Sequence, residues 1–362
     1  MFFSVIIFII TLLILVVIHE LGHFLVAKKF GIKVEEFGFG IPPRIFGKKM
    51  GETLYSLNAL PLGGFVRLMG EDSVDKKELS NPRSFASQHV NKRILVVVAG
   101  VVMNLILSWV IFYSVIIFQN YKIIYPTVDQ GVYIGFLEKD FPAQIAGVNI
   151  GDRLLSVDGK NVKDFEQAKS FIKEKNGQPV TLSLSDVDGN NKRQLIVPQK
   201  GSEKAGFIIG VGFSPVGTKV YKSFTEKLFS GITYSWQLTK VTFLGLGKLG
   251  SDLGSGNFKV ASQSVSGPVG LATMSNNILS GGIEALPFYL WFVGVISLTL
   301  SIFNVLPIPA LDGGRLLFLV IEAVTKKKVK EEKERMVHQI GFAILLSLAL
   351  LVTYSDIRKL FP

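Results

Sequence analysis

Four long apolar runs constrain the fold of this chain more than any other feature. Residues 1–18 contain no charged side chain, 94–118 is uncharged over 25 residues, and 285–311 is uncharged over 27. A shorter uncharged run spans 340–353. A helix needs about 20 mostly apolar residues to cross a bilayer core. Because hydrophobic residues also make up 48% of the chain, we expect a polytopic α-helical membrane protein with about four transmembrane helices.

The charged residues predict how these helices are oriented. Residues 28–93 hold twelve Lys and Arg against seven acids, and 326–335 hold six against three. The positive-inside rule therefore predicts that both loops are cytoplasmic. Both termini and the long segment 119–284 would then lie outside. That segment is itself basic, but long translocated domains escape the rule.

The remaining composition excludes several classes of function. The net charge is +11, but no basic stripe with interleaved aromatic residues indicates nucleic acid as a partner. The chain has no cysteine, which excludes disulfides, cysteine-ligated zinc and thiol catalysis.

A metal-binding motif lies at the inner end of the first apolar run, where residues 19–23 read H-E-L-G-H. On a helix, positions i and i+4 share a face, so His19 and His23 can bind one metal ion. Glu20 is then placed to act as a general base, because zinc lowers the pKa of a water that it binds to about 7. The alternative is a pair of helix histidines facing a polar cavity. Ionisable residues inside a span favour a functional interpretation, because they are costly there.

A catalytic zinc site needs a third protein ligand. The extended H-E-x-x-H-x-x-G-x-x-H pattern is absent, because Val26 and Lys29 stand where Gly and His are required. Glu35 and Glu36 are close enough in sequence to serve, although a solvated loop is the simpler interpretation.

A second candidate lies at the end of the third apolar run, where residues 304–315 read N-V-L-P-I-P-A-L-D-G-G-R. Two prolines break a helix there, and an unwound segment at membrane depth is tolerated where it lines a protein cavity. Asp312 at this break is a suitable third ligand, and Asn304 could hold a substrate amide or a developing oxyanion. The alternative for Asp312 is the N-cap of a following helix over 316–324.

The segments between the apolar runs predict smaller elements. Gly and Pro interrupt apolar residues over 37–43 and 55–67, which is typical of short strands or hairpins. Residues 71–91 are polar and predict a loop with a short helix. Beyond residue 119, strands are expected at 132–137, 153–157, 180–185 and 194–197, with a hairpin around Asp188 and Gly189. A helix from Asp164 to Lys175 and an amphipathic or packed helix over 224–248 complete the pattern.

Together, the two site motifs resemble those of the site-2 protease family of intramembrane zinc metalloproteases. The closest similarity is to the bacterial branch named for the regulator of sigma-E protease, which has H-E-x-x-H in the first span and N-x-x-P-x-P-x-L-D-G in the third. The G-F-G element at 38–40 and the P-L-G-G-F-V-R element at 61–67 also match. Residues 141–159 look like the core of a bacterial PDZ domain. The branch's A-G-P-x-x-N element departs here, because Val101 replaces the proline of the 99–104 stretch.

The resemblance implies one zinc ion and a membrane-associated β-hairpin loop that presents an edge strand to substrate. It also implies one exterior α/β PDZ domain that binds a peptide or chain end. The substrate-binding residues that it implies are Asn304, Gly38, Phe39, Gly40, Gly63 and Gly64. Four regions are expected: a membrane half at 1–118, the PDZ domain at 119–200, a helical region at 201–284 and a second membrane half at 285–362.

The predicted function is hydrolysis of a peptide bond within or near the transmembrane helix of a membrane-protein substrate. Such regulated intramembrane proteolysis would act on anti-sigma factors or remnant signal peptides in the bacterial inner membrane, in contact with lipid. Two alternatives remain: a membrane PDZ scaffold without catalysis and a zinc transporter. A transporter would need several intramembrane ligands along a path.

Overall fold

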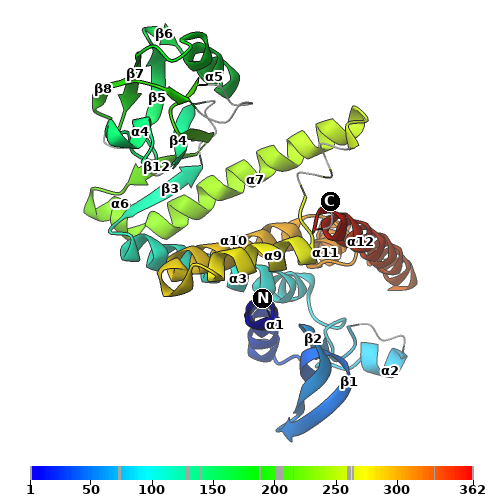
Figure 1. The fold of residues 1–362 in the computed structure, drawn as a ribbon. Helices are drawn as coiled ribbons and strands as arrows, with labels where there is room; N and C mark the ends of the chain where they lie inside the picture. The colour runs from blue at the N-terminus through cyan, green and yellow to red at the C-terminus, as the bar shows by residue number, and fades with distance from the viewer. Residues whose placement is uncertain are drawn as a thin grey trace. The chain divides into compact units, whose positions relative to one another are not determined.

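The computed structural model describes residues 2–71, 75–126, 131–138, 140–186, 189–200, 207–214, 216–258, 262, 265–329 and 331–360. The chain divides into two compact units. The first combines residues 1–112 with 249–362, and the second comprises residues 113–248 (Figure 1). Each unit is described below by itself.

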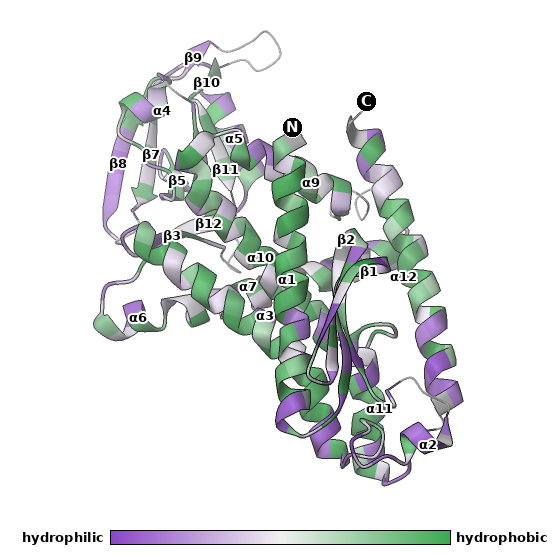
Figure 2. Cartoon of the chain, turned by 90° about the horizontal axis from the view of Figure 1, so that it is seen from below, coloured by the Kyte–Doolittle hydropathy of each residue, from purple (hydrophilic) through white to green (hydrophobic). Residues whose placement is uncertain are grey.

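Four helices in the described residues are long and apolar enough to cross a membrane, which confirms the predicted number. They span Phe3–Lys29, Val90–Phe118, Gly282–Val305 and Glu332–Arg358. Figure 2 shows the hydrophobic character of the helices that carry the first and third spans, and the hydrophilic residues near one end of the fourth.

The helices of the first unit follow from this pattern. Their bounds are α1 (Phe2–Lys29), α2 (Lys76–Leu79), α3 (Val90–Phe118), α9 (Pro268–Leu279), the 3-10 helix η1 (Gly282–Ala285), α10 (Leu286–Val305), α11 (Asp312–Thr325) and α12 (Glu331–Leu360). Helix α10 ends at Val305, before the two prolines, because each proline lacks an N–H and clashes with the preceding turn. The short helix expected in the polar loop is α2.

The bundle core is apolar, with single polar contacts between helices. Phe8 and Leu15 of α1 pack with Tyr289, Phe292 and Ile296 of α10. Two serines of α10 donate to α3, from Ser297 Oγ to the Asn104 carbonyl at 2.8 Å and from Ser301 Oγ to the Val101 carbonyl at 3.0 Å. Hydroxyl donors of this kind are common where membrane helices meet. Helix α3 is continuous through Val101, so the missing proline leaves the span unbroken.

The Ser266-Gly267-Pro268 turn, which leads into α9, is held by α12. The buried Asp356 carboxylate accepts the N–H groups of Gly267 and Gly270, each at 2.8 Å. These N–H groups lie at the N-terminus of α9, where helix donors lack partners within the helix. Asp356 therefore caps α9 from another helix.

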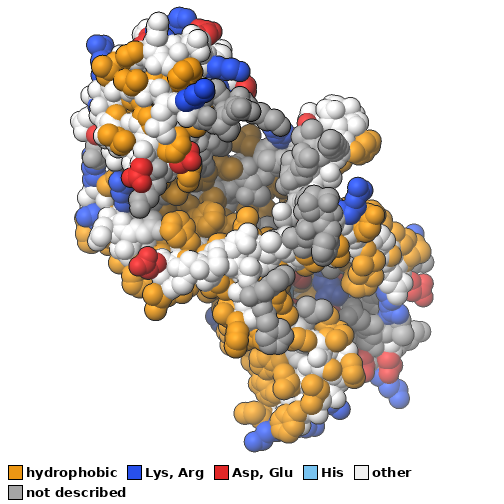
Figure 3. Space-filling model, in the orientation of Figure 1, with side chains coloured by type: hydrophobic (Ala, Val, Ile, Leu, Met, Phe, Trp, Pro, Cys, Tyr) orange, Lys and Arg blue, Asp and Glu red, His pale blue; other side chains and the backbone are white. Residues whose placement is uncertain are grey.

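Two long strands form the loop between the first two spans, where short strands were expected. They are β1 (Val34–Met50) and β2 (Thr53–Leu68), which pair antiparallel with an irregular register. Residues 36–39 pair with 54–57 on one side and with 64–67 on the other. The stretch 54–57 also pairs with 46–49. Four stretches therefore run side by side, and the outer ones are 44–50 and 64–68. Figure 3 shows hydrophobic side chains gathered over the lower part of the view, where this hairpin lies.

Glu36 corrects the expectation of a solvated loop at this position. Its side chain is buried within the β1–β2 sheet, where it accepts a hydrogen bond from Ser56 Oγ at 2.6 Å and lies 3.4 Å from Arg67. Glu36 is therefore satisfied by the sheet itself.

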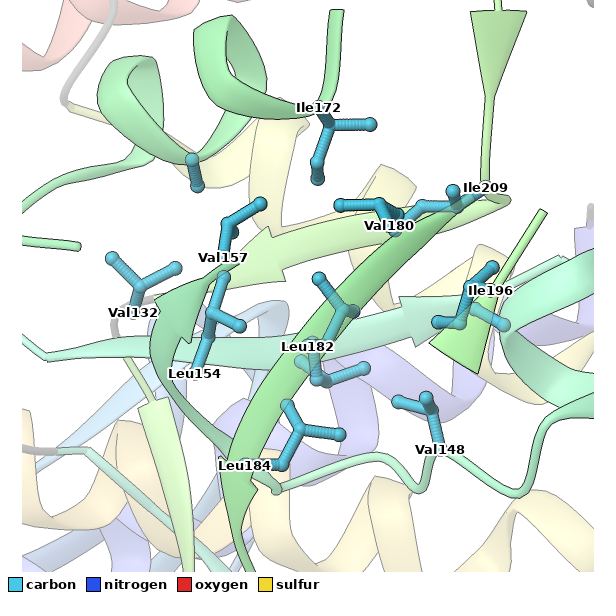
Figure 4. Close-up of a cluster of buried hydrophobic side chains, with 13 residues drawn as sticks. Val132, Val148, Leu154, Val157, Ile172, Val180, Leu182, Leu184, Ile196 and Ile209 are labelled. Atoms are coloured by element: carbon cyan, nitrogen blue, oxygen red, sulfur yellow. The ribbon is translucent and has the colours of Figure 1, made fainter. Parts of the chain in front are cut away.

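The second unit contains a small α/β domain. Its strands are β3 (Lys122–Pro126), β4 (Val132–Leu137), β5 (Arg153–Val157), β6 (Lys160–Asn161), β7 (Val180–Ser185), β8 (Asn191–Ile196), β9 (Gln199–Lys200), β10 (Phe207–Ile208), β11 (Val211–Ser214) and β12 (Val216–Val220). Its helices are α4 (Pro142–Ile145), α5 (Phe165–Glu174), α6 (Phe224–Leu228) and α7, which begins at Ser230 and ends at Gly254 in the first unit. The main sheet has the order β11-β4-β5-β7-β8, with β6 beside β5. Leu154, Leu182 and Ile172 are among the side chains that fill its core (Figure 4).

Most of the predicted elements of this domain are confirmed. Strands β4, β5 and β7 have the predicted bounds, and the Asp164 side chain caps α5 by accepting from Gln167 N at 2.8 Å. Strand β8 begins earlier than predicted, at Asn191. Asp188 of the predicted hairpin turn lies outside the described residues. Strand β11 pairs with β4, so the sheet continues beyond the predicted domain boundary at residue 200.

The α/β domain is inserted between two strands that pair with each other. The end of β3 and the start of β12 meet where Pro126 pairs with Val216. This small ribbon packs on α7, because Tyr234 and Gln237 donate side-chain hydrogen bonds to the carbonyls of Ile124 and Pro126. The single helix expected over 224–248 is instead two helices, α6 and α7.

Candidate active site

The structure brings together the three residues that were predicted from the sequence to be metal ligands. His19 and His23 lie one turn apart on α1, and Asp312 begins α11. Asp312 Oδ2 lies 2.9 Å from His19 Nε2 and 3.2 Å from His23 Nε2, and the two Nε2 atoms are 3.2 Å apart. One ligand atom from each residue falls within 4.8 Å of the others. Residues 293 positions apart in the chain therefore converge on one point.

This donor set fits a zinc ion. Tetrahedral zinc with bonds of 2.0–2.1 Å holds its ligand atoms about 3.3 Å apart, close to the spacing observed here. His23 Nδ1 donates to the Val96 carbonyl at 2.8 Å. Because a carbonyl only accepts, Nδ1 carries the proton and Nε2 keeps its lone pair for a metal. Two imidazoles and one carboxylate leave a coordination position for substrate, as catalytic zinc sites require.

Asn104 completes the surroundings of His19. Its amide lies fully buried with Nδ2 3.5 Å from His19 Nδ1, while its Oδ1 has no hydrogen-bond partner. The two ends of an amide are interchangeable in placement. With the amide turned over, Oδ1 accepts from His19 Nδ1–H and the buried oxygen is satisfied. His19 Nε2 is then the atom left for a metal.

A glycine on α3 makes room for this cluster, and the motif analysis did not identify it as part of the site. A Cβ on Gly100 would lie 2.4 Å from His23 Nε2 and 2.8 Å from His19 Nε2. Gly22 of α1 is likewise pressed against the Ala99 carbonyl, where a Cβ would lie 2.4 Å from the oxygen. The Ala99-Gly100 pair was visible in the sequence, but its contact with the histidines depends on how α1 and α3 pack.

The break after α10 presents Asp312. Leu311 is extended, with φ −103° and ψ 167°, and Asp312 is the first residue of α11. The N-cap position belongs to Leu311, which makes no side-chain cap. The alternative in which Asp312 caps a helix over 316–324 is therefore wrong, because α11 starts at Asp312 itself.

A pocket of about 200 Å³ opens beside the cluster. It is lined by Glu20, His23, Phe65, Val66, Leu68, Glu71, Val96, Val97, Asp312 and Arg315. Glu20 therefore shares the pocket with two of the three candidate ligands. Arg315 and Glu71 form an ion pair that ties α11 to the end of β2. Neither residue was assigned to the site from sequence, because Glu71 is one acid in a polar loop and Arg315 lies just beyond the matched motif.

The glycine elements of the β1–β2 sheet differ in their access to this pocket. Gly38 and Phe39 pair on both sides, so their backbone has no free edge within the described sheet. The outer stretch 64–68 lies at the pocket, and Gly64 approaches Glu20, whose Cγ would be 3.5 Å from a Cβ at that position. Gly63 has φ +102°, and Gly40 has φ +80°. The substrate role of all five residues stays a prediction, and the free edge favours Gly64.

Asn304 is the remaining residue that the sequence predicted to contact substrate. It is half-buried near the end of α10 and is not among the described residues that line the pocket. Its role with substrate stays a prediction.

Comparisons with known proteins identify the family of this chain. A family model described as Peptidase family M50 matches residues 7–348. The zinc metalloprotease RasP of Geobacillus kaustophilus is 32% identical, with 99% of this chain and 98% of that protein covered. The regulator of sigma-W protease RasP of Bacillus subtilis is 31% identical, with 99% of each covered.

Among solved structures, a PDZ domain of the SdrC-like protein from Listeria monocytogenes is 23% identical. The match covers 24% of this chain and 90% of the Listeria chain, with a TM-score of 0.22. The family match over nearly the whole chain is the decisive comparison: the chain belongs to peptidase family M50 and is an intramembrane zinc metalloprotease.

Proposed function

We propose that this protein cleaves the transmembrane helix of a membrane-protein substrate, with His19, His23 and Asp312 holding one zinc ion and Glu20 as the general base. One observation carries the proposal: the three candidate ligands converge beside Glu20 in a pocket bordered by a free strand edge. Helix α1, which carries His19, Glu20 and His23, is long and apolar enough to cross a membrane, and so is the helix that ends at Val305, before Asp312.

Each group has a defined part in the chemistry. When bound, zinc supplies a Lewis acid that polarises the scissile carbonyl and acidifies water. Glu20 takes the proton of the attacking water and delivers it to the departing amine. The lining side chains Phe65, Val96 and Val97 limit the access of bulk water and so strengthen the electrostatic interactions inside.

The free edge at 64–68 addresses a second requirement. A transmembrane helix satisfies all its backbone groups internally, so its peptide bonds are protected until it unwinds. An unwound substrate segment can pair with an exposed strand edge and exchange helical hydrogen bonds for inter-strand ones. Because Gly64 lies beside Glu20, pairing here would bring the substrate backbone to the catalytic base.

The test is Glu20→Gln in the purified full-length protein, with Glu35→Gln as the matched control on an acid outside the pocket. The readouts are bound zinc per chain and cleavage of a single-span model protein in proteoliposomes. We expect Glu20→Gln to keep its zinc and to lose cleavage, because the amide cannot accept the proton. Glu35→Gln should retain both.

The same measurements separate the alternatives. A membrane scaffold predicts no cleavage by the wild type, and a transporter predicts zinc flux across the vesicle membrane. If the Glu20→Gln variant cleaved the substrate at the wild-type rate, the general-base assignment would be contradicted.

We further propose that the α/β domain binds an extended peptide or chain end and filters substrates. A groove of about 450 Å³ lies along edge strand β11 and helix α5, lined by apolar residues that include Phe136, Ile172 and Phe213. Lys169 and Lys173 stand on its helix side and favour a peptide carboxylate. Strand addition at a sheet edge is the usual way in which PDZ domains bind peptides.

The pairing of Pro126 with Val216 offers a clean deletion. Residues 127–215 can be replaced by Asn-Gly, a turn that closes a two-residue hairpin. We expect the shortened protein to keep its zinc and to cleave substrates with large extramembrane domains less selectively. Loss of cleavage of a short single-span substrate, with zinc retained, would instead make the domain part of the catalytic unit.

We propose the bacterial inner membrane as the location, with both termini and the α/β domain outside. The two basic loops support this orientation. Because the chain lacks cysteine, single cysteines at Lys77 and Lys160 can be labelled without background. An impermeant reagent should label only the second in intact spheroplasts, and the reverse pattern would overturn the orientation.

A further inference from the structure

Helix α12 meets the break between α10 and α11 through a histidine. His338 Nδ1 accepts the backbone N–H of Ala310 at 3.0 Å. Ala310 lies two residues before Asp312 and has φ +77°, a conformation that non-glycine residues rarely adopt. The hydrogen bond therefore holds an unfavourable backbone turn next to the third candidate ligand.

The break has little regular hydrogen bonding of its own. Leu306 N, Ile308 N and Leu311 N make short-range turns to the carbonyls of Phe303, Leu306 and Ile308. Ala310 N instead donates to a side chain from another helix, His338. A backbone N–H at membrane depth that lacks an acceptor is costly, because no water is available there to replace it. His338 supplies that acceptor.

A glycine on the same face of α12 allows the close approach. Gly341 follows His338 by three residues, and a Cβ on it would lie 2.4 Å from Pro309 Cβ and 2.8 Å from the Pro309 carbonyl carbon and oxygen. The His338 ring also lies 6.0 Å from the Phe318 ring of α11. Most other α12 side chains between 339 and 354 are exposed. The contact with the break is thus a local attachment of α12, separate from the one that Asp356 makes to α9 farther along the helix.

We propose that His338 is a positioning residue for the metal site, which acts through the Ala310 N–H to hold Asp312 against His19 and His23. The inference rests on the proposed role of Asp312 as a ligand. The atom of His338 that acts is Nδ1, which accepts the Ala310 N–H. Gly341 sets the distance between α12 and Pro309. Without the acceptor, the 309–311 turn relaxes and Asp312 loses its fixed position.

The test compares two substitutions of one residue in the full-length protein in detergent. His338→Leu removes the acceptor and keeps an apolar side chain. His338→Asn keeps an acceptor, because its Oδ1 lies as many bonds from the backbone as Nδ1 does. Gln339→Leu, at the adjacent exposed position, is the control. Zinc affinity is measured by competition with a chelator, and kcat and KM are measured on one model substrate.

We expect His338→Leu to weaken zinc binding by about 10- to 100-fold, the range seen when residues that orient metal ligands are lost. It should lower kcat and leave KM nearly unchanged, because the substrate edge at 64–68 is untouched. His338→Asn should return zinc affinity to within about threefold of wild type by the same reasoning. Gly341→Ala should weaken zinc as His338→Leu does, by forcing Pro309 away.

Two results would overturn the proposal. One is wild-type zinc affinity in both His338→Leu and Gly341→Ala. The other is equal loss in His338→Leu and His338→Asn, because the ring's packing and not its acceptor would then matter. If His338→Leu does not fold, the zinc affinities of His338→Asn and Gly341→Ala test the proposal without it. Failure of the ligand assignment is distinguishable, because Asp312→Ala would then keep wild-type zinc affinity whatever the result at His338.

Discussion

The two sides of the metal site are built differently. His19 and His23 project from a regular helix whose period alone places them on one face. Asp312 follows an unwound segment, Leu306 to Leu311, in which Ala310 has a positive φ and successive turns replace helical hydrogen bonds. Local geometry therefore places both histidines on one face, and α3 only orients their rings through Val96 and Asn104, whereas the position of the carboxylate itself depends on contacts from other elements.

Those contacts come from several directions. His338 of α12 accepts from Ala310, Glu71 pairs with Arg315, and Arg93 pairs with Glu322 farther along α11. The side chains of Arg93 and Glu322 are only 7% and 18% exposed. A partly buried pair of this kind is strongly destabilising when one partner is removed, because the other charge is left uncompensated. We infer that α11 keeps its position through tertiary polar contacts.

The largest expected effect comes from removing the carboxylate. Asp312→Ala should reduce cleavage by about 10³-fold or more, because metal catalysis supplies several kcal/mol and each tenfold corresponds to about 1.4 kcal/mol. Zinc should also dissociate more readily. Activity and zinc content of the purified variant would be compared with Glu284→Ala, an exposed acid outside the site. Full zinc retention in Asp312→Ala would contradict the comparison of the two sides, since the histidine helix would then suffice to hold the metal.

The next effect tests the histidine side through packing. Gly100→Ala should reduce zinc affinity by about 10²-fold or more, because its Cβ would overlap both imidazoles and displace them from their orientation. The control is Gly245→Ala in α7, where no atom lies within 4 Å of the added carbon. Zinc titration of both variants provides the measurement. Normal zinc affinity in Gly100→Ala would show that α3 can move away and that the histidine side is not rigid.

These contrasts explain how much the sequence could predict. The H-E-x-x-H spacing and the proline break are local patterns, so both halves of the site and the four spans were found from sequence. The β1–β2 loop was misjudged as short strands, because pairing of 36–39 on both sides is set by contacts far apart in sequence. Gly100, Val96 and His338 were not assigned to the site for the same reason, since each acts through a neighbour on another helix.

A smaller effect is expected from the buried amide that faces His19. Asn104→Leu should weaken zinc binding by about 10- to 100-fold, because His19 Nδ1–H would lose its acceptor. Ser108→Ala, one turn along the same helix, removes a hydrogen bond within α3 and serves as the control. Chelator competition provides the measurement. Unchanged affinity in Asn104→Leu would mean that α1 orients His19 without help, which would sharpen the contrast between the two sides.

The smallest effect concerns the C-terminal end of the histidine helix α1. Hydrogen bonds from Arg83 and from Lys28 at the end of α1 lower the pKa of Glu52 to about 2, from a usual value of 4.5. These groups are much more exposed than the Arg93–Glu322 pair, with Arg83 49% and Lys28 33% exposed. Water and salt therefore screen the interaction, and its contribution to the free energy of unfolding is about 1 kcal/mol or less.

The sign of its pH dependence follows from the lowered pKa. A folded-state pKa below the unfolded one stabilises the fold above the unfolded value, and this stabilisation is lost as pH falls from about 4.5 towards 2. The Glu52→Gln variant should therefore unfold at a slightly lower temperature than wild type at pH 7. The difference between the two unfolding temperatures should shrink steadily below pH 4.5. Thermal unfolding of both proteins between pH 7 and pH 3, at low and high salt, provides the measurement. A difference that is constant with pH would contradict an ion-pair origin. A difference of about 3–5 kcal/mol, the loss expected when one partner of a buried pair is removed, would show that α1 also depends on ion pairs for its position. The histidine side would then be held as the carboxylate side is, by tertiary contacts beyond the helix itself.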